Sequence, residues 1–255
     1  MSFAALTEQL PLFVLASLRI AIVMAGMPAP FGGVAPVRIR TAVSVMLSLA
    51  LCASLLPNMP KIPMDPVSLG KAAACELFLG AVMGLTVRVT LAAAEIAGTM
   101  AGQAMGLGFA TSVDPTFGEG ILPTAYLLGS LGTLIFFILN GHHVVIAALA
   151  DSLRYVPIGQ AVPVAARAGA LSLGSDLVAR GLQIAAPVVA TMFIVQLGTA
   201  FVARTAQKVH LFAFSFSIAV GAGMLVLWVS APTICTAIAV QVSRLPDAFL
   251  ALGGR

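Results

Sequence analysis

The chain alternates between long apolar runs and short segments rich in proline, glycine and charge. The runs exceed ten residues and show no period-two alternation, so they predict helices and not strands. No fixed-period repeat and no linker between two cores is present, which favours one cooperative all-α unit. The six runs are Leu12–Met27, Thr41–Leu56, Ala72 to about Gly106, Pro123–Leu149, Leu177–Val202 and Leu211–Val240.

The connections between the runs are marked by prolines, which end helices and favour turns. The stretch Asp151–Asp176 is more polar than its neighbours and contains Pro157 and Pro163. It therefore predicts the longest connection of the chain. The earlier connections contain Pro28, Pro30 and Pro36, then Pro57, Pro60, Pro63 and Pro66.

The lengths of the runs do not suit an ordinary membrane bundle. Two runs have only 16 residues, whereas about 20 are needed to cross the hydrocarbon core. The third could form one helix of about 52 Å, much longer than the ~30 Å core. Basic residues also occur in every connection except the one around Gly106–Gly120, although a simple multi-pass protein concentrates them on one side. We therefore expect many of these helices to pack against protein instead of lipid.

The composition excludes a soluble globular enzyme. Hydrophobic residues make up 60% of the 255 positions and charged residues 9%, against about 45–50% and 25% in soluble domains. Disordered chains are poor in apolar residues, so that class is excluded as well. The net charge of +4 comes from residues scattered singly, with no basic run and no phosphate-binding loop. The chain is thus predicted to be a multi-pass membrane protein that does not bind nucleic acid.

The sequence offers no catalytic or metal-binding motif, since HExxH, GxSxG and CxxC are all absent. His142 and His143 are adjacent, so on a helix they point about 100° apart and do not serve one metal. We expect no enzymatic activity, no cofactor and no metal.

Met1–Pro11 has no basic start typical of a signal peptide, so we expect the first run to be retained. The three cysteines are interpreted as small buried hydrophobic residues: Cys52, Cys75 and Cys235.

The third run carries a stripe of glycines and charges. On one straight helix these residues share an arc of about 120°, because each residue advances about 100°. Glycines four residues apart let another backbone approach closely. A charged side chain that faces lipid is energetically costly. The stripe indicates either packing within the chain, or a subunit contact or water-filled passage. Its members are Glu76, Gly80, Gly84, Arg88, Glu95, Gly98, Gly102 and Gly106.

Arg19 lies in the middle of the first run, and a charged residue inside a membrane usually has a function. The plainer alternative is an arginine paired with a carboxylate, such as Glu76 or Glu95, that only fixes packing.

Arg38 and Arg40 follow the first proline-rich connection. They indicate either a polar rim that contacts a subunit or headgroups, or a pair of solvated charges.

The segment Gly106–Leu122 predicts an irregular loop, because Asp114-Pro115 and its glycines disfavour helix. Irregular backbone at membrane depth is tolerated only inside protein or along an aqueous cavity. An ordinary surface turn is the alternative. The residues expected to form a gate are Gly106, Gly108, Phe109, Asp114, Pro115, Phe117, Gly118 and Ile121.

Taken in order, these landmarks resemble the FliR/SctT family of the type III protein export apparatus. The most recognisable stretch is Gly108-Phe109-Ala110-Thr111-Ser112-Val113-Asp114-Pro115. One turn departs from the family pattern, because Ala206-Gln207 and His210 stand where a Pro-Gln pair and an asparagine are usual. The other landmarks are Arg19, Pro30-Phe31-Gly32, Pro36-Val37-Arg38-Ile39-Arg40, Glu76, Glu95, Gln103, Asn140-Gly141-His142, Ser152, Pro157-Ile158-Gly159 and Ala185-Ala186-Pro187.

The resemblance implies a single-copy subunit of an export gate through which unfolded flagellar or injectisome proteins pass. Its partners would be FliP-, FliQ- and FlhB-like subunits in the bacterial inner membrane, within the flagellar basal body or the injectisome base. The family fold implies kinked helical hairpins packed in a helical hetero-oligomer. Residues 1–175 would form a FliP-like part and residues 176–255 a FliQ-like hairpin. The loop at Gly106–Leu122 would plug the pore.

A secondary transporter or small-solute channel is the competing interpretation. Many transporters show matching broken helices in the two halves of the chain. We find no such paired interruption in this sequence. The export-gate interpretation is therefore preferred.

Overall fold

The computed structural model of the chain describes residues 3–28, 36–55, 65–108, 122–205 and 211–252. These residues are almost entirely helical and contain no strand, so the predicted all-α fold is confirmed. The long apolar runs form helices whose backbone groups are satisfied internally, as a membrane protein requires. The helices are α1 (Phe3–Gly26), α2 (Val37–Leu55), α3 (Pro66–Ala104), α5 (Pro123–Ile138), α6 (Gly141–Tyr155), α7 (Val164–Thr205), α8 (Leu211–Ser243) and α9 (Leu245–Leu252).

Several of these helices are long and apolar enough to cross a membrane. Within the described ranges, three qualify singly: Pro66–Ala104, Val164–Val202 and Phe216–Ala251. A fourth span results if α5 and α6 are counted together, although they are bent by 65° at their junction. The prediction of an all-α membrane protein with several membrane-spanning helices is confirmed to this extent.

The break between α5 and α6 was not expected, because Pro123–Leu149 looks continuous by hydropathy. Asn140 lies between the end of α5 at Ile138 and the start of α6, and it adopts the left-handed region, with φ 55° and ψ 31°. Asparagine tolerates this conformation better than most residues. Gly141 then begins α6 against the ring of Phe136, which leaves no room for a side chain. The Asn-Gly pair was the signal for this break.

The predicted long connection Asp151–Asp176 is wrong. Helix α6 continues to Tyr155 and α7 begins at Val164, so only residues 156–163 connect them. Most residues of the polar stretch after Pro163 are good helix formers, among them four alanines between positions 164 and 176. Polarity was therefore misread as irregular structure, whereas Pro157 and Pro163 do mark the actual connection.

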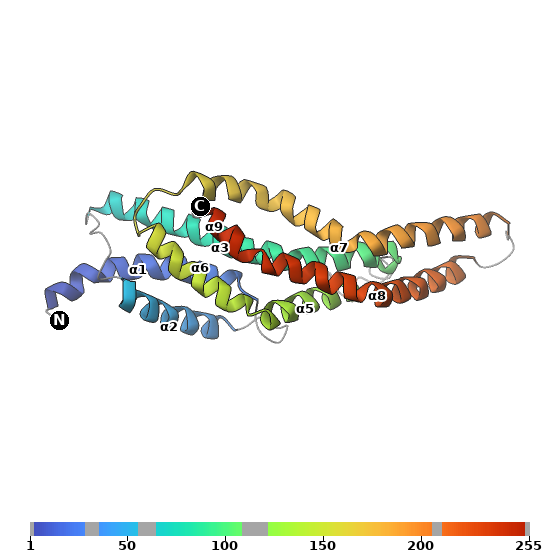
Figure 1. Ribbon diagram of the computed structural model, residues 1–255, viewed down its shortest axis with the longest axis horizontal. Coiled ribbons are helices and arrows are strands. Elements are labelled where there is room, and N and C mark those ends of the chain that lie inside the picture. Colours follow the sequence, from blue (N-terminus) through green and yellow to red (C-terminus); the bar gives the residue numbers. More distant parts are fainter. Residues whose placement is uncertain (1–2, 29–35, 56–64, 109–121, 206–210, 253–255) are drawn as a thin grey trace. The chain divides into compact units, whose positions relative to one another are not determined.

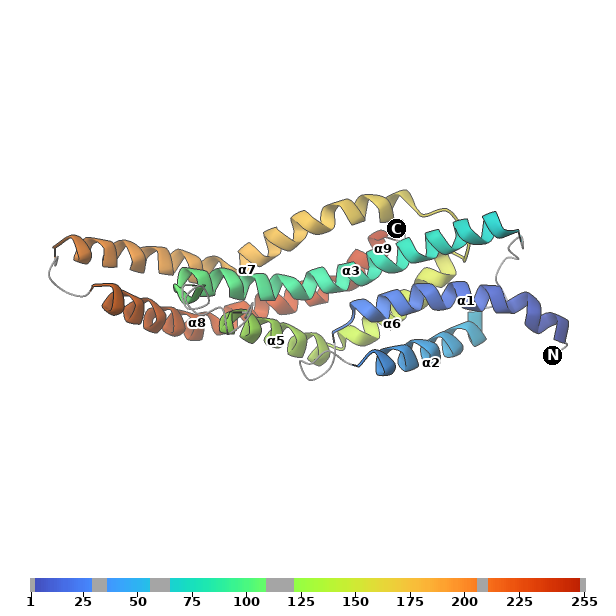
Figure 2. The same cartoon turned by 180° about the vertical axis from the view of Figure 1, so that it is seen from behind.

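The chain divides into two compact units, each made of separate segments. The first contains Met1–Val89, Phe136–Gly174 and Ser243–Arg255. In it, α1 packs against α2 and α6, and α9 packs against α6. Figure 1 shows α1, α2 and α6 side by side, and Figure 2 shows the same three helices from behind. Helix α3 joins them by close contact, because Gly80 and Gly84 face the backbone of α1.

The second unit contains Thr90–Ile135 and Ser175–Val242. In it, the second half of α3 touches α5 through Gly98, where an added Cβ would meet the backbone of Thr124 and Ala125. Gln196 on α7 donates a hydrogen bond to the carbonyl of Ala104, at 2.6 Å. Helix α3 is thus the helix that α5 and α7 both contact.

One cut between the units falls at Gly174/Ser175, close to the expected boundary between the FliP-like and FliQ-like parts. This position lies inside helix α7, so no linker marks it. The other cuts fall inside α3 and near the ends of α5 and α8. The division into 1–175 and 176–255 therefore stays a prediction based on the family resemblance.

Helix α3 begins with a capping carboxylate. Asp65 precedes Pro66 and accepts a hydrogen bond from the amide of Ser68 at 3.1 Å, the arrangement expected of an N-cap residue before a proline. These hydrogen bonds from Ser68 hold the pKa of the Asp65 carboxyl below its ordinary value.

We predict that the Ser68 amide proton reports this cap. Because the folded pKa of Asp65 is depressed, the cap persists above the ordinary aspartate pKa of about 3.9 and is lost only as pH falls through the lower folded value. The amide shift should therefore titrate with a midpoint below about 3.9 in an NMR pH series. Asp65→Asn keeps an N-cap without a titrating group, so its Ser68 shift should stay flat. A midpoint at or above the ordinary value would contradict the cap.

Candidate functional site

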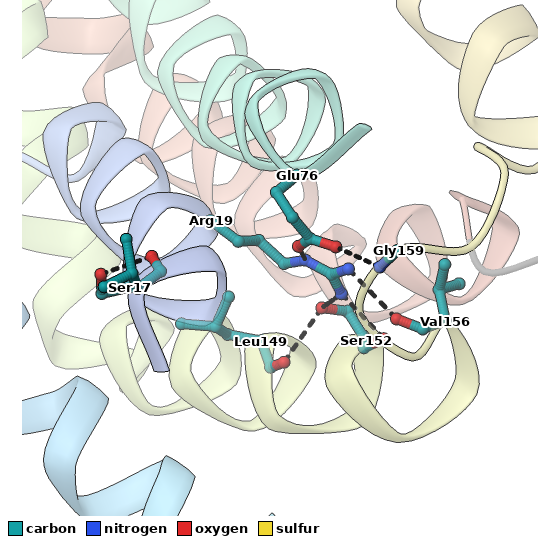
Figure 3. A network of polar contacts seen from close by, with 8 residues as sticks. Ser17, Arg19, Glu76, Leu149, Ser152, Val156 and Gly159 are labelled. Atoms are coloured by element: carbon teal, nitrogen blue, oxygen red, sulfur yellow. Dashed lines mark hydrogen bonds and ion pairs between the residues drawn. The ribbon is translucent and has the colours of Figure 1, made fainter. Parts of the chain in front are cut away.

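A buried ion pair joins helices α1 and α3. Arg19 on α1 and Glu76 on α3 lie with Nε and Oε2 2.6 Å apart. Their side chains are 0% and 1% exposed, so water does not screen the pair. Figure 3 shows both side chains pointing toward each other between α1 and α3. Of the two carboxylates that the sequence offered to Arg19, the structure pairs it with Glu76.

The same guanidinium closes the end of helix α6. Its Nη1 donates to the carbonyl and the hydroxyl of Ser152, at 3.0 and 3.2 Å, and its Nη2 donates to the carbonyl of Val156 at 3.1 Å. The last carbonyls of a helix lack partners within the helix and carry partial negative charge. A cation at this position satisfies both needs. Arg19 therefore binds α6 to α1 as well as to α3.

The second carboxylate oxygen of Glu76 holds the connection after α6. Oε1 accepts a hydrogen bond from the amide of Gly159 at 3.3 Å. Gly159 has φ +82° and is the third residue of a turn closed by Gln160 N to Pro157 O at 3.2 Å. A turn with positive φ at this position favours glycine. The Pro157-Ile158-Gly159 sequence thus positions one amide for Glu76 (Figure 3).

The energetics make this network a structural centre. Burying an isolated charge costs several kcal/mol, and a partner offsets the cost only if the remaining polar atoms are also bonded. Here the guanidinium meets one carboxylate, one hydroxyl and two carbonyls, and both carboxylate oxygens have donors. The network therefore specifies how α1, α3, α6 and the 156–163 connection meet.

A cavity of about 330 Å³ lies beside the network. Its wall is mainly apolar and comes from α3, α6, α9 and the start of α7. The polar side chains on it are Arg19, Asp151, Ser152 and Tyr155. Asp151 also pairs with Arg154 at 3.5 Å, in an exposed position. Such a wall accommodates an apolar group. The guanidinium of Arg19 beside the cavity already donates hydrogen bonds to Glu76, Ser152 and Val156 (Figure 3).

No cluster of three or more histidine, cysteine, aspartate or glutamate side chains that could hold a metal occurs within the described ranges. His142 and His143 lie with ring centroids 4.2 Å apart, and the ring of Phe137 lies 5.4 Å from that of His142. These residues form an aromatic cluster at the start of α6.

The predicted glycine stripe separates into two kinds of residue. Gly80 and Gly84 face α1, and Gly98 and Gly102 face α5 or the residue before it, so these glycines pack helices of the same chain. Gly106 lies beyond the end of α3 with φ +80°, so it is not on the helix as the straight-helix prediction assumed. Arg88 and Glu95, at the edge of the stripe, are exposed.

The two expected rim residues differ in their surroundings. Arg40 is partly buried and donates a hydrogen bond from Nη1 to the carbonyl of Ala25 at 3.3 Å, near the end of α1. Arg38 is exposed.

Of the expected gate residues, Gly106 and Gly108 are described, with Gly106 near the ring of Phe216. The others lie outside the described residues: Phe109, Asp114, Pro115, Phe117, Gly118 and Ile121.

The model of the family described as bacterial export proteins, family 1, matches residues 10–245, nearly the whole chain. The chain belongs to this family. The resemblance to the FliR/SctT family is thereby confirmed.

Curated relatives of this export protein carry the name flagellar biosynthetic protein FliR. The relative from Pectobacterium carotovorum subsp. carotovorum is 28% identical over 204 residues, covering 77% of this chain and 75% of the relative. That from Escherichia coli strain K12 is 28% identical over 191 residues, covering 74% and 72%. The Caulobacter vibrioides relative is 28% identical over 215 residues, covering 83% and 86%. The family match includes every residue of the Arg19 network.

Proposed function

We propose that this chain is the FliR-like subunit of a flagellar protein export gate in the bacterial inner membrane. It contributes one copy to a complex with FliP-, FliQ- and FlhB-like subunits, and that complex forms the channel for unfolded export substrates. The segment Gly106–Leu122 would supply the plug that the family resemblance implies. The chain acts as a structural subunit and performs no catalysis of its own.

The observation that carries this proposal is the family match over residues 10–245, together with relatives that are all named as flagellar biosynthetic proteins. The match covers both compact units, so it does not depend on a single motif. The match covers 72–86% of these relatives, so the shared assembly is inferred by analogy with the family.

The exposure of the C-terminal helices supports a location in a membrane. In the most apolar windows of Val164–Val202 and Phe216–Ala251, only 22% and 17% of the residues are buried within the chain. Large side chains such as Phe193, Phe201 and Trp228 are 61–79% exposed. In a multi-pass protein these surfaces contact lipid or other subunits.

The proposal is tested by deleting the gene in the flagellated bacterium that encodes it. We expect loss of motility and loss of flagellar substrates from the culture medium, both restored by the wild-type gene. A tagged chain should co-purify with FliP- and FliQ-like subunits, and native mass spectrometry should find one copy per complex. If secretion stays intact in the deletion strain while uptake of a small solute changes, the chain is a transporter and the proposal fails.

A further inference from the structure

The cavity beside the Arg19 network lies wholly within the first compact unit, because every residue on its wall belongs to the segments of that unit. Part of the wall is buried and apolar. Leu79, Val82 and Met83 of α3 are 3–7% exposed and form this base of the cavity. The guanidinium of Arg19 at the base is engaged by its own hydrogen bonds. The base therefore offers a surface for an apolar group.

Other residues on the wall are exposed, so the cavity has a mouth at the surface of the unit. Tyr155 and Leu250 are 51% and 49% exposed, and the side chain of Asp151 is 46% exposed. Arg154 lies beside this mouth, since its Nη1 is 3.5 Å from Oδ1 of Asp151. A tyrosine, a leucine and two charges at one opening are typical of the depth at which hydrocarbon meets the lipid headgroups.

The cavity is long and narrow. Helix α6 lines it from Val144 to Tyr155, eleven residues apart, so at 1.5 Å per residue this wall extends about 16 Å. A volume of about 330 Å³ over that length gives a mean cross-section of about 20 Å². A helix with its side chains is about 10–12 Å across, which corresponds to roughly 80 Å² or more. The cavity therefore has room for one extended chain and not for a helix.

The wall and the mouth together indicate the chemistry of the occupant. Cavities lined by apolar side chains exclude water and bind hydrocarbon groups, and in a protein with membrane-spanning helices the surrounding lipids supply hydrocarbon chains. The exposed contact between Arg154 and Asp151 is weak, so both charges can bind a ligand. Arginine binds phosphate strongly, and a carboxylate accepts hydrogen bonds from an ammonium group. A zwitterionic phospholipid carries all three groups.

We propose that this cavity binds a zwitterionic phospholipid. One acyl chain lies along α6, against Leu79, Val82 and Met83 of α3. The phosphate lies beside Arg154 and the amine beside Asp151. The bound chain fills the space between α3, α6 and α9 and so stabilises the packing of the first unit. The site requires only a location in a membrane, so it does not depend on the proposed function.

The test uses the full chain, purified with the subunits that accompany it, in vesicles of equal parts phosphatidylethanolamine and phosphatidylglycerol. A trace of the phosphatidylethanolamine carries a photoreactive diazirine at the end of one acyl chain. Irradiation should label Val82 or Met83, as found by mass spectrometry of peptides. Lipid that only surrounds the protein does not reach these buried side chains, so their labelling reports the cavity.

A filled cavity should exclude the lipid chain. Ala148→Phe places a ring in the cavity and should lower the labelling of α3 about tenfold or more. Ala168→Phe is the matched control, since Ala168 is exposed and does not line the cavity, and it should stay within about twofold of wild type. If Ala148→Phe lowers the amount of folded protein, Ala147→Phe at an exposed position of the wall replaces it, with the same expected loss.

The headgroup is tested by placing the diazirine on the phosphatidylglycerol, which has no amine. The zwitterionic probe should label α3 about threefold more than this anionic probe, and Asp151→Asn should abolish the preference. Equal labelling of the wild-type chain by both probes would overturn the zwitterionic assignment.

Two further results would overturn the site itself. The first is a wild-type chain in which lipid does not label Val82 or Met83, because another subunit then covers the cavity or lipid does not enter it. The second is labelling that the ring at position 148 or 147 leaves unchanged. Neither result bears on the proposed function, which motility and secretion test separately.

Discussion

Replacing Arg19 by leucine is expected to lower the free energy of unfolding by about 3–5 kcal/mol, the usual effect of removing one partner of a buried ion pair. The substitution leaves the Glu76 carboxylate buried, with one donor in place of two. It also removes the donors to the last carbonyls of α6. Because domains have only about 5–15 kcal/mol in total, the variant should accumulate poorly in the membrane. Immunoblots of membrane fractions and thermal unfolding in detergent measure both effects.

The controls separate burial from charge. Arg180→Leu removes the partly exposed pair with Asp176, whose atoms are 3.5 Å apart, and should change stability by about 1 kcal/mol or less. The double variant Arg19→Leu with Glu76→Leu should recover much of the lost stability, because no charge is left buried alone. Arg19→Lys keeps the charge but loses the planar fork, so an intermediate loss is expected. If Arg19→Leu is as stable as wild type, the network is not a structural centre.

The sequence predicted the helices well where hydropathy and proline agree. The run from Ala72 predicted one continuous helix, and α3 indeed extends over Pro66–Ala104. The break at Asn140 was missed, since residues on both sides are apolar and only backbone conformation distinguishes it. The start of α7 was missed for the opposite reason, because arginine, serine and aspartate make residues 164–176 more polar while the alanines and leucines among them favour helix. Helix ends in this chain depend on such local preferences.

The candidate site was only partly accessible from the sequence. An arginine in an apolar run implies a carboxylate partner, and the choice was narrowed to Glu76 or Glu95. The partners Ser152, Val156 and Gly159 could not be derived, because all three bond through main-chain atoms, which do not depend on the side chain. The one available signal was Gly159 two residues after Pro157, which indicates a turn. Tertiary placement of that turn comes only from the fold.

Replacing Gly98 by leucine is expected to separate α3 from α5. An added Cβ would lie 2.5 Å from the Cα of Ala125 and would also meet the carbonyl of Thr124, so both contacts are with main chain and have little freedom to shift. The Thr124 hydroxyl donates a hydrogen bond to the Gly98 carbonyl at 2.7 Å, and this bond would be lost as the helices move apart. Overpacking of this kind costs about 1–3 kcal/mol or more. Thermal unfolding of the purified complex measures the loss.

A matched glycine distinguishes this contact from helix propensity. Gly174 lies in α7 with nothing within 4 Å of an added Cβ. Gly174→Ala should therefore be neutral or stabilise the protein by up to about 1 kcal/mol, since alanine is the better helix former. Gly98→Ala gains the same propensity, so any net loss in that variant measures the contact with α5 alone. Equal behaviour of the two alanine variants would contradict the close approach of α3 to α5, and the stripe would then have no packing role at Gly98.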